Sequence, residues 1–208
     1  ILLLPEIFKK WPAQTVATSK WLNSQGISRQ LTAKYCHSGW LEKISHGCYK
    51  RADDKIDWKG AVYALQAQLG LNIVPSAYTS LHLQGYRHQI NVKGQNVYLL
   101  GSPKTALPRW FIKGDWQAKI HYKTSSLFPP QLALCAYDVG GHFAIQVCSP
   151  ERAILEVLDE ISSEHAFEDA SNIMSGLLDL KSDVVLNLLK KCRSNKVKRI
   201  FMFLANYH

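Results

Sequence analysis

The sequence of 208 residues predicts an α+β protein with two domains, a winged helix-turn-helix at residues 1–54 and a mixed domain at residues 55–208. Three observations support this class. A helix, a glycine turn, a second helix and a basic hairpin follow one another in residues 15–51. Short β-rich runs, which predict a small antiparallel sheet, occupy the middle of the chain, and the C-terminal third has helical patterns.

The chain begins with a predicted packing helix. Leu4, Ile7, Phe8 and Trp11 recur at helical spacing, and Pro12 ends the pattern. The apolar side of this helix is expected to pack within the N-terminal domain.

The helix-turn-helix follows from its capping residues. Thr18 is a good N-cap for a short helix through Gln25, and Gly26 breaks that helix. Ser28 can cap a second helix that runs to about Ser38. This order is typical of DNA-binding units, although pairs of solvated helices joined by a glycine also occur in proteins that never bind DNA.

The second helix has two predicted faces. The face expected to pack inward carries Ile27, Leu31, Tyr35 and Ser38, with Lys34 beside them. The face expected to meet DNA carries Arg29, Thr32, Ala33, Cys36 and His37. Small, polar or cationic side chains of this kind can approach base edges.

A wing is predicted after this helix. Gly39 ends the helix, and residues 41–44 and 48–51 can pair as a hairpin around residues 45–47. Residues 15–51 hold six Lys or Arg and one acid, which suits a phosphate backbone. The residues predicted to bind DNA are Ser28, Arg29, Gln30, Thr32, Lys34, His37, Lys43, His46, Lys50 and Arg51.

The second domain is expected to begin after a short polar linker at residues 52–57. Amphipathic helices are predicted at residues 58–70 and after Pro75. The strands are predicted at residues 96–100, 119–123, 131–137 and 142–147. Basic and aromatic residues alternate between residues 86 and 123, which indicates either a nucleic-acid surface or, as we prefer, an aromatic core with a solvated charged face.

The last third is predicted to be helical and divided by charge. Ser149 and Pro150 begin a helix as N-cap and first residue. Residues 151–183 hold nine acids and two bases, whereas residues 190–199 hold six bases and no acid. These blocks either pair with each other or face different partners.

Composition favours a binding protein of the cytoplasm. A net charge of +9 favours an anionic partner, and five scattered cysteines without a CxxC motif suit a reducing compartment. No membrane span and no cofactor are predicted. No metal is predicted either, because Cys36 and His37 diverge too far on one helix to bind one zinc ion together with His46 and Cys48.

No motif predicts an enzyme. Gly101, Ser102 and Asp115 resemble part of a nucleotidyltransferase site, but position 117 is Gln where the second carboxylate is needed. Phosphate-binding loops, nucleophile elbows and zinc-protease motifs are absent from the sequence.

Several stretches resemble one family. The residues GIS at 26–28, SGWLEKISHGCYKR at 38–51, WKGAVYALQAQLG at 58–70, SAYTSLHLQGYRH at 76–88 and VYLLGSPKTALPRWF at 97–111 are similar to AbiE-type antitoxins, the AbiEi family of transcriptional regulators.

The resemblance implies a DNA-binding autorepressor of a phage-defence operon. Its C-terminal domain would counteract a nucleotidyltransferase-like toxin, with or without direct contact. Cationic residues expected to serve this protective role are Lys104, Arg109, Lys113, Lys190, Lys191, Arg193, Lys196, Lys198 and Arg199. Two alternatives remain open, namely an enzyme that acts on nucleic acid through the basic middle segment and a protein-interaction module that uses the acidic block.

Overall fold

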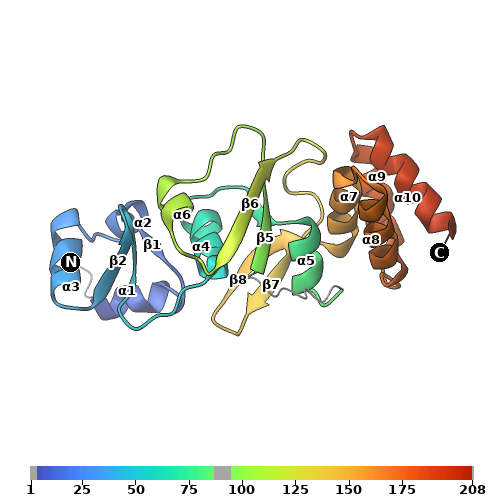
Figure 1. The fold of residues 1–208 in the computed structure, drawn as a ribbon. Coiled ribbons are helices and arrows are strands. Elements are labelled where there is room, and N and C mark those ends of the chain that lie inside the picture. Colours follow the sequence, from blue (N-terminus) through green and yellow to red (C-terminus); the bar gives the residue numbers. More distant parts are fainter. Residues whose placement is uncertain (1–3, 87–94, 208) are drawn as a thin grey trace. The chain divides into compact units, whose positions relative to one another are not determined.

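The protein has an α+β fold, as predicted (Figure 1). We describe residues 4–86 and 95–207 of a computed structural model. The chain forms two compact units, each assembled from separate stretches. Unit 1 comprises residues 1–73, 105–119 and 138–145, and unit 2 comprises residues 74–104, 120–137 and 146–208.

Unit 1 contains the helices and hairpin that were predicted near the N-terminus. Its elements are α1 (Leu4–Lys10), β1 (Ala17–Thr18), α2 (Ser19–Ser24), α3 (Arg29–His37), β2 (Leu41–Ser45), β3 (Cys48–Arg51), α4 (Trp58–Tyr63), the π-helical turn η1 (Ala64–Gln68) and α6 (Arg109–Lys113).

The predicted caps and turns of α2 and α3 are confirmed. The Thr18 hydroxyl accepts a hydrogen bond from the Trp21 amide at 3.2 Å, and the Ser28 hydroxyl accepts one from the Leu31 amide at 3.2 Å. Gly26 and Gly39 have φ angles of +81° and +76°, a region in which glycine is free of strain. These local features therefore fix where each helix begins and ends.

Strand β1 before α2 and strands β2 and β3 after α3 form a three-stranded sheet of order β1-β3-β2. The predicted hairpin is confirmed, since β2 and β3 pair antiparallel with Lys43 opposite Tyr49. The hairpin turn is tied to α2, because the Ser19 amide donates to the Gly47 carbonyl at 2.9 Å. Beneath these elements lies a core of Ile7, Trp11, Ala17, Leu22, Ile27 and Leu41.

The helix predicted at residues 58–70 consists of α4 followed by η1, so its last part winds more widely than an α-helix. The Gln68 side chain accepts from the Thr18 amide at 2.9 Å and donates to the Val16 carbonyl at 2.7 Å. These bonds tie η1 to β1 across fifty residues of chain. The linker predicted at residues 52–57 thus lies inside unit 1, and the boundary after residue 54 stays a prediction.

The remaining elements belong at least in part to unit 2, and the strand at residues 143–148 is divided equally between the units. They are β4 (Ile73–Pro75), α5 (Ala77–Leu83), β5 (Gln95–Gly101), β6 (Ala118–Thr124), β7 (Leu134–Val139), β8 (Phe143–Cys148), α7 (Pro150–Glu160), α8 (Glu164–Ser175), α9 (Ser182–Lys191) and α10 (Asn195–Tyr207). The structure has small sheets in this region, as predicted, but it divides the expected sheet in two. The strands form a three-stranded sheet of order β4-β5-β6 and a separate pair β7-β8.

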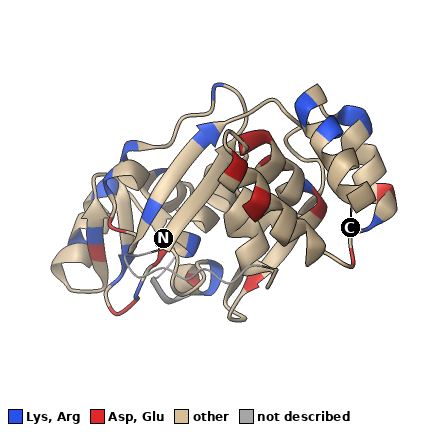
Figure 2. Ribbon diagram, turned by 45° about the vertical axis from the view of Figure 1, so that its right-hand side comes forward, with Lys and Arg blue, Asp and Glu red and all other residues tan. Residues whose placement is uncertain are grey.

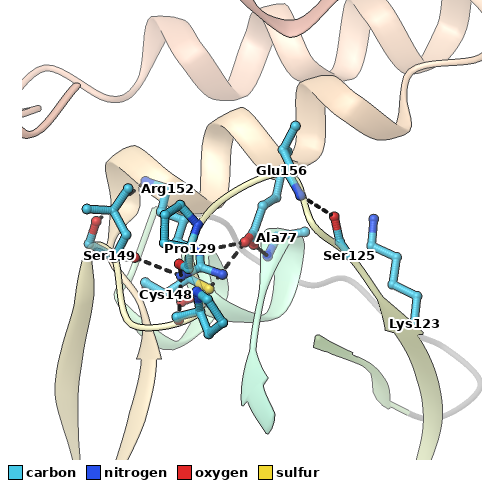
Figure 3. Close-up of polar contacts among 12 residues, drawn as sticks. Ala77, Lys123, Ser125, Pro129, Cys148, Ser149, Arg152 and Glu156 are labelled. Carbon is cyan, nitrogen blue, oxygen red and sulfur yellow. Dashed lines mark hydrogen bonds and ion pairs between the residues drawn. The ribbon is translucent and has the colours of Figure 1, made fainter. Parts of the chain in front are cut away.

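Helix α7 carries a buried ion pair in the core of unit 2 (Figure 3). The Arg152 Nε lies 2.8 Å from Glu156 Oε1, one helical turn away. Arg152 also donates to the carbonyls of Pro130 and Leu132, and Glu156 accepts from the Ala77 amide at 3.2 Å. The pair therefore joins α7 to α5 and to the loop before β7.

Within the described ranges, none of the helices combines the length and the apolar character that crossing a membrane requires.

Candidate nucleic-acid interface

Helix α3 presents a continuous polar face to solvent. Its exposed residues are Arg29, Gln30, Ala33, Lys34 and His37. They recur at spacings of three and four, so they lie along one side of the helix. This side carries two cations and a histidine, and none of its exposed residues is a bulky apolar one.

The structure corrects part of the face that was predicted for α3. Thr32 is buried, and its hydroxyl donates to the Ser28 carbonyl at 3.0 Å, so it is not placed to meet a base. Cys36 packs against the unit 1 core. Lys34 and Ser38, expected to point inward, are exposed. The helical period predicted for α3 is confirmed, but its buried side includes residues 32 and 36 instead of residues 34 and 38.

A cleft of about 740 Å³ separates α3 from the hairpin. Its lining comes from α2, α3, β2, β3 and the turns between them and consists of Ser19, Lys20, Asn23, Ile27, Arg29, Thr32, Ala33, Cys36, Lys43, His46 and Tyr49. Three of these side chains are cationic, and no acidic residue is among them. The cleft therefore offers positive charge and hydrogen-bond donors to an anionic ligand.

Two predicted wing residues, Lys43 and His46, are exposed and line this cleft. Lys50 is placed differently, because its ammonium group pairs with Glu42 and donates to the Asp54 carbonyl at 3.1 Å. An ammonium group held in this way has less to offer a phosphate.

Arg51 points inward instead of towards a ligand. Its guanidinium donates to the carbonyls of Phe8 and Trp11 and lies 4.5 Å from the centre of the Phe8 ring. Burial lowers the pKa of Arg51, and the nearby Asp54 carboxylate opposes that shift. Arg51 thus fastens α1 to the end of β3, which removes it from the predicted phosphate contacts.

Ser28 is also committed to the fold, since its hydroxyl caps α3. The N-terminal end of the helix is fixed by this bond. Of the ten predicted DNA-binding residues, the exposed and uncommitted side chains are Arg29, Gln30, Lys34, His37, Lys43 and His46.

Burial disfavours the thiolate form of both cysteines of this region. Burial raises the pKa of Cys48 to about 12, and burial also raises the pKa of Cys36 despite the opposing charge of Lys43. Within residues 4–86 and 95–207, no group of three or more His, Cys, Asp or Glu side chains is arranged to hold a metal ion.

Helix α6 brings two further cations to unit 1. Arg109 and Lys113 are exposed and, together with Trp110, line a small cleft with Ser45 and His46 of the hairpin. Both had been assigned to a protective surface, whereas Lys104 of that set lies in unit 2.

Comparison with known proteins identifies the family. Residues 3–92 match the family described as "Transcriptional regulator, AbiEi antitoxin N-terminal domain". Residues 94–208 match the one described as "Transcriptional regulator, AbiEi antitoxin, Type IV TA system". The chain belongs to the AbiEi antitoxins. It is accordingly a transcriptional regulator of a type IV toxin-antitoxin system.

Among solved structures, the AbiEi chain is similar to the RV2827C protein from Mycobacterium tuberculosis, known from a crystal structure. The TM-score is 0.56 at 12% sequence identity, and the match covers 92% of this chain and 71% of that chain. At this identity the likeness concerns the fold alone. A search of curated proteins gave no match.

The C-terminal cations of this AbiEi protein gather at the turn between α9 and α10 (Figure 2). Lys190, Lys191, Arg193 and Arg199 are exposed, and Lys198 is half-buried. Lys196 is committed to the fold, since its ammonium group donates to the carbonyls of Asp159 and Ile161 at 2.9 and 2.6 Å. It thereby caps the end of α7.

Sequence reasoning missed several residues that line the large cleft. Lys20 and Asn23 come from α2, and Tyr49 comes from β3. Lys20 and Asn23 stand three residues apart, so the helical period already indicated that they share a face of α2. No comparable signal in the sequence placed Arg109 and Lys113 beside the hairpin.

Proposed function

We propose that this AbiEi antitoxin binds operator DNA upstream of its own operon through a winged helix formed by α1–α3 and the β2-β3 hairpin. The observation that carries the proposal is the cation-lined cleft of about 740 Å³ between α3 and the hairpin, together with the exposed face of α3. Arg29 and Gln30 are exposed in the first turn of α3, and the N-terminal residues of a recognition helix are those that contact base edges in a major groove.

The two sides of the interface have different roles in this proposal. Arg29, Gln30 and His37 read base edges from α3, whereas Lys43 and His46 bind phosphate or the minor groove from the wing. Arg29 and Lys20 both line the cleft, and together they supply hydrogen-bond donors to base and backbone.

We further propose that the protein represses its own operon and counteracts a nucleotidyltransferase-like toxin in phage defence. In this proposal it acts in the cytoplasm, and it acts by binding and not by catalysis. Family membership supports the regulatory and antitoxin roles. The exposed cations at the α9–α10 turn, which lie outside unit 1, are the surface proposed for the protective role. Their charge suits an RNA or an acidic protein partner.

An electrophoretic mobility shift with DNA from upstream of the operon tests operator binding. Wild-type protein should shift this DNA at lower concentration than it shifts random DNA. Arg29→Ala should reduce that discrimination by about 1–3 kcal/mol if Arg29 contacts a guanine edge. Lys43→Ala should weaken binding to both DNAs equally, because a phosphate contact carries no sequence information.

The matched control for both variants is Lys50→Ala, since the Lys50 ammonium group already pairs with Glu42. Its effect on DNA affinity should be the smallest of the three. Equal affinity of wild-type protein for operator and random DNA would remove the proposed function.

A further inference from the structure

The helix α6 lies beside the wing although about sixty residues separate the two in the sequence. The helix contacts β2. A cleft of about 270 Å³ is lined by Ser45 and His46 of the hairpin and by Arg109, Trp110 and Lys113 of α6. The tip of the wing and one side of α6 therefore form a single surface within unit 1.

An aromatic cluster fixes the orientation of α6. Trp110 and Phe111 are buried, and the Trp116 indole nitrogen donates to the Phe111 carbonyl at 2.7 Å. The Trp116 ring packs over Gly114, where an added Cβ would lie 2.2 Å from it. With these aromatic residues inside, Arg109 and Lys113 stand one turn apart on the same side of α6 and are exposed.

The cations of α6 continue those of the large cleft. His46 lines both clefts, and no acidic residue lines either of them. The nearest acid in the sequence, Asp115, lines neither cleft, and its carboxylate accepts a hydrogen bond from the Gln117 amide at 3.1 Å. Positive charge thus runs from α3 across the wing to α6 with no carboxylate among the residues that line it.

We propose that Arg109 and Lys113 bind the DNA phosphate backbone beside the wing and extend the footprint of the protein beyond the contacts of α3 and the hairpin. The proposal rests on the proposed operator binding. Both side chains contact phosphate only, because the wing lies between them and the bases read by α3. They add affinity and register but no sequence discrimination.

The test measures DNA affinity of the full-length protein by fluorescence anisotropy as salt is raised between about 50 and 200 mM. The variant Arg109→Gln, Lys113→Gln keeps the length of the side chains and removes their charge. Its affinity for operator and random DNA should fall by the same factor, and the slope of log affinity against log salt should become shallower by about two.

The matched control is Lys55→Gln, Lys181→Gln, which removes two exposed charges that line neither cleft and should leave the slope at the wild-type value. Circular dichroism melting confirms that each variant is folded. A hydroxyl-radical footprint should lose protection on one flank only in the Arg109 and Lys113 variant.

Two results overturn the proposal and are distinguishable. If wild-type protein binds operator DNA with a steep salt dependence, and the α6 variant has the same slope and footprint, α6 is not part of the interface and the proposed function stands. If wild-type protein has no salt-dependent affinity for DNA, the proposed function fails and the role of α6 fails with it.

Discussion

Arg152 and Glu156 show how a charged pair is retained inside unit 2. Both side chains are almost completely buried, at 3% and 2% exposure. The Glu156 carboxylate also accepts the bond from the Ala77 amide that ties α7 to α5. Removing one partner would leave the other charge buried without compensation, which costs far more than losing a surface pair.

Glu156→Ala should therefore lower the free energy of unfolding by about 3–5 kcal/mol, measured by urea denaturation. The control is Glu160→Ala on the same helix. Its ion pair with Lys123 is partly exposed, so the loss should be about 1 kcal/mol or less. Equal losses in the two variants would contradict the role assigned to the buried pair.

Cys48 makes the stability of unit 1 depend on pH. Burial raises the pKa of its thiol from 9.0 to about 12, so the folded state keeps a proton that the unfolded state releases. The contribution of the buried, protonated Cys48 thiol to the free energy of unfolding is fully present below pH 9 and is lost as the pH rises towards 12. The slope is about 1.4 kcal/mol per pH unit.

Replacing Cys48 by Ala should flatten this dependence. Urea denaturation between about pH 8 and 11 would show the free energy of unfolding of the wild-type protein falling more steeply than that of Cys48→Ala. Other groups titrate equally in both proteins, so the difference between the two curves isolates the thiol. Parallel curves would show that Cys48 is not protected from ionisation.

At the scale of elements, close packing joins α4 to the N-terminal segment. Gly60 faces the backbone of Gln14 and Thr15, and a Cβ at position 60 would lie 2.0 Å from the Gln14 carbonyl oxygen. That neighbour is main chain and cannot rotate away. Only glycine permits this approach.

Gly60→Ala should lower the free energy of unfolding by about 1–3 kcal/mol, although alanine favours helix by up to about 1 kcal/mol. The control is Gly176→Ala at the end of α8, where the nearest atom would lie at an ordinary 3.5 Å. Thermal unfolding of both variants decides the matter. A stability of Gly60→Ala at or above the wild-type value would refute the contact.

The elements that could be predicted from sequence depend on neighbours along the chain. Thr18, Ser28 and Gly39 fix the helix ends through atoms within a few residues, and these predictions are confirmed. The hydrogen bonds of Arg51 to α1 and of Gln68 to β1 join residues about forty and fifty positions apart. No local pattern in the sequence encodes such partners.

The same distinction holds for the candidate site. The basic hairpin and the exposed cations of α3 follow from helical and strand periods. A polar side chain such as Thr32 predicts a solvent-facing position, but its hydroxyl donates to the Ser28 carbonyl in the preceding turn of its own helix. Arg109 and Lys113 are distant from the wing in the sequence, and only the folding of unit 1 places them beside it.

At the scale of the whole molecule, the two family matches meet between residues 92 and 94, but each compact unit draws on both sides of that junction. Residues 105–119 and 138–145 belong with the N-terminal elements in unit 1. Point substitutions are therefore a cleaner way than truncation to separate DNA binding from protection.

The most direct test of the central claim is expression of a reporter gene from the operon's own promoter in cells that produce the full-length protein. Wild-type protein should repress the reporter, and the Arg29→Ala, Lys43→Ala variant should release repression at equal protein level. Co-expressed toxin should still be counteracted by this variant, because both substitutions lie in unit 1. Full repression by the variant would contradict the claim that α3 and the wing bind the operator.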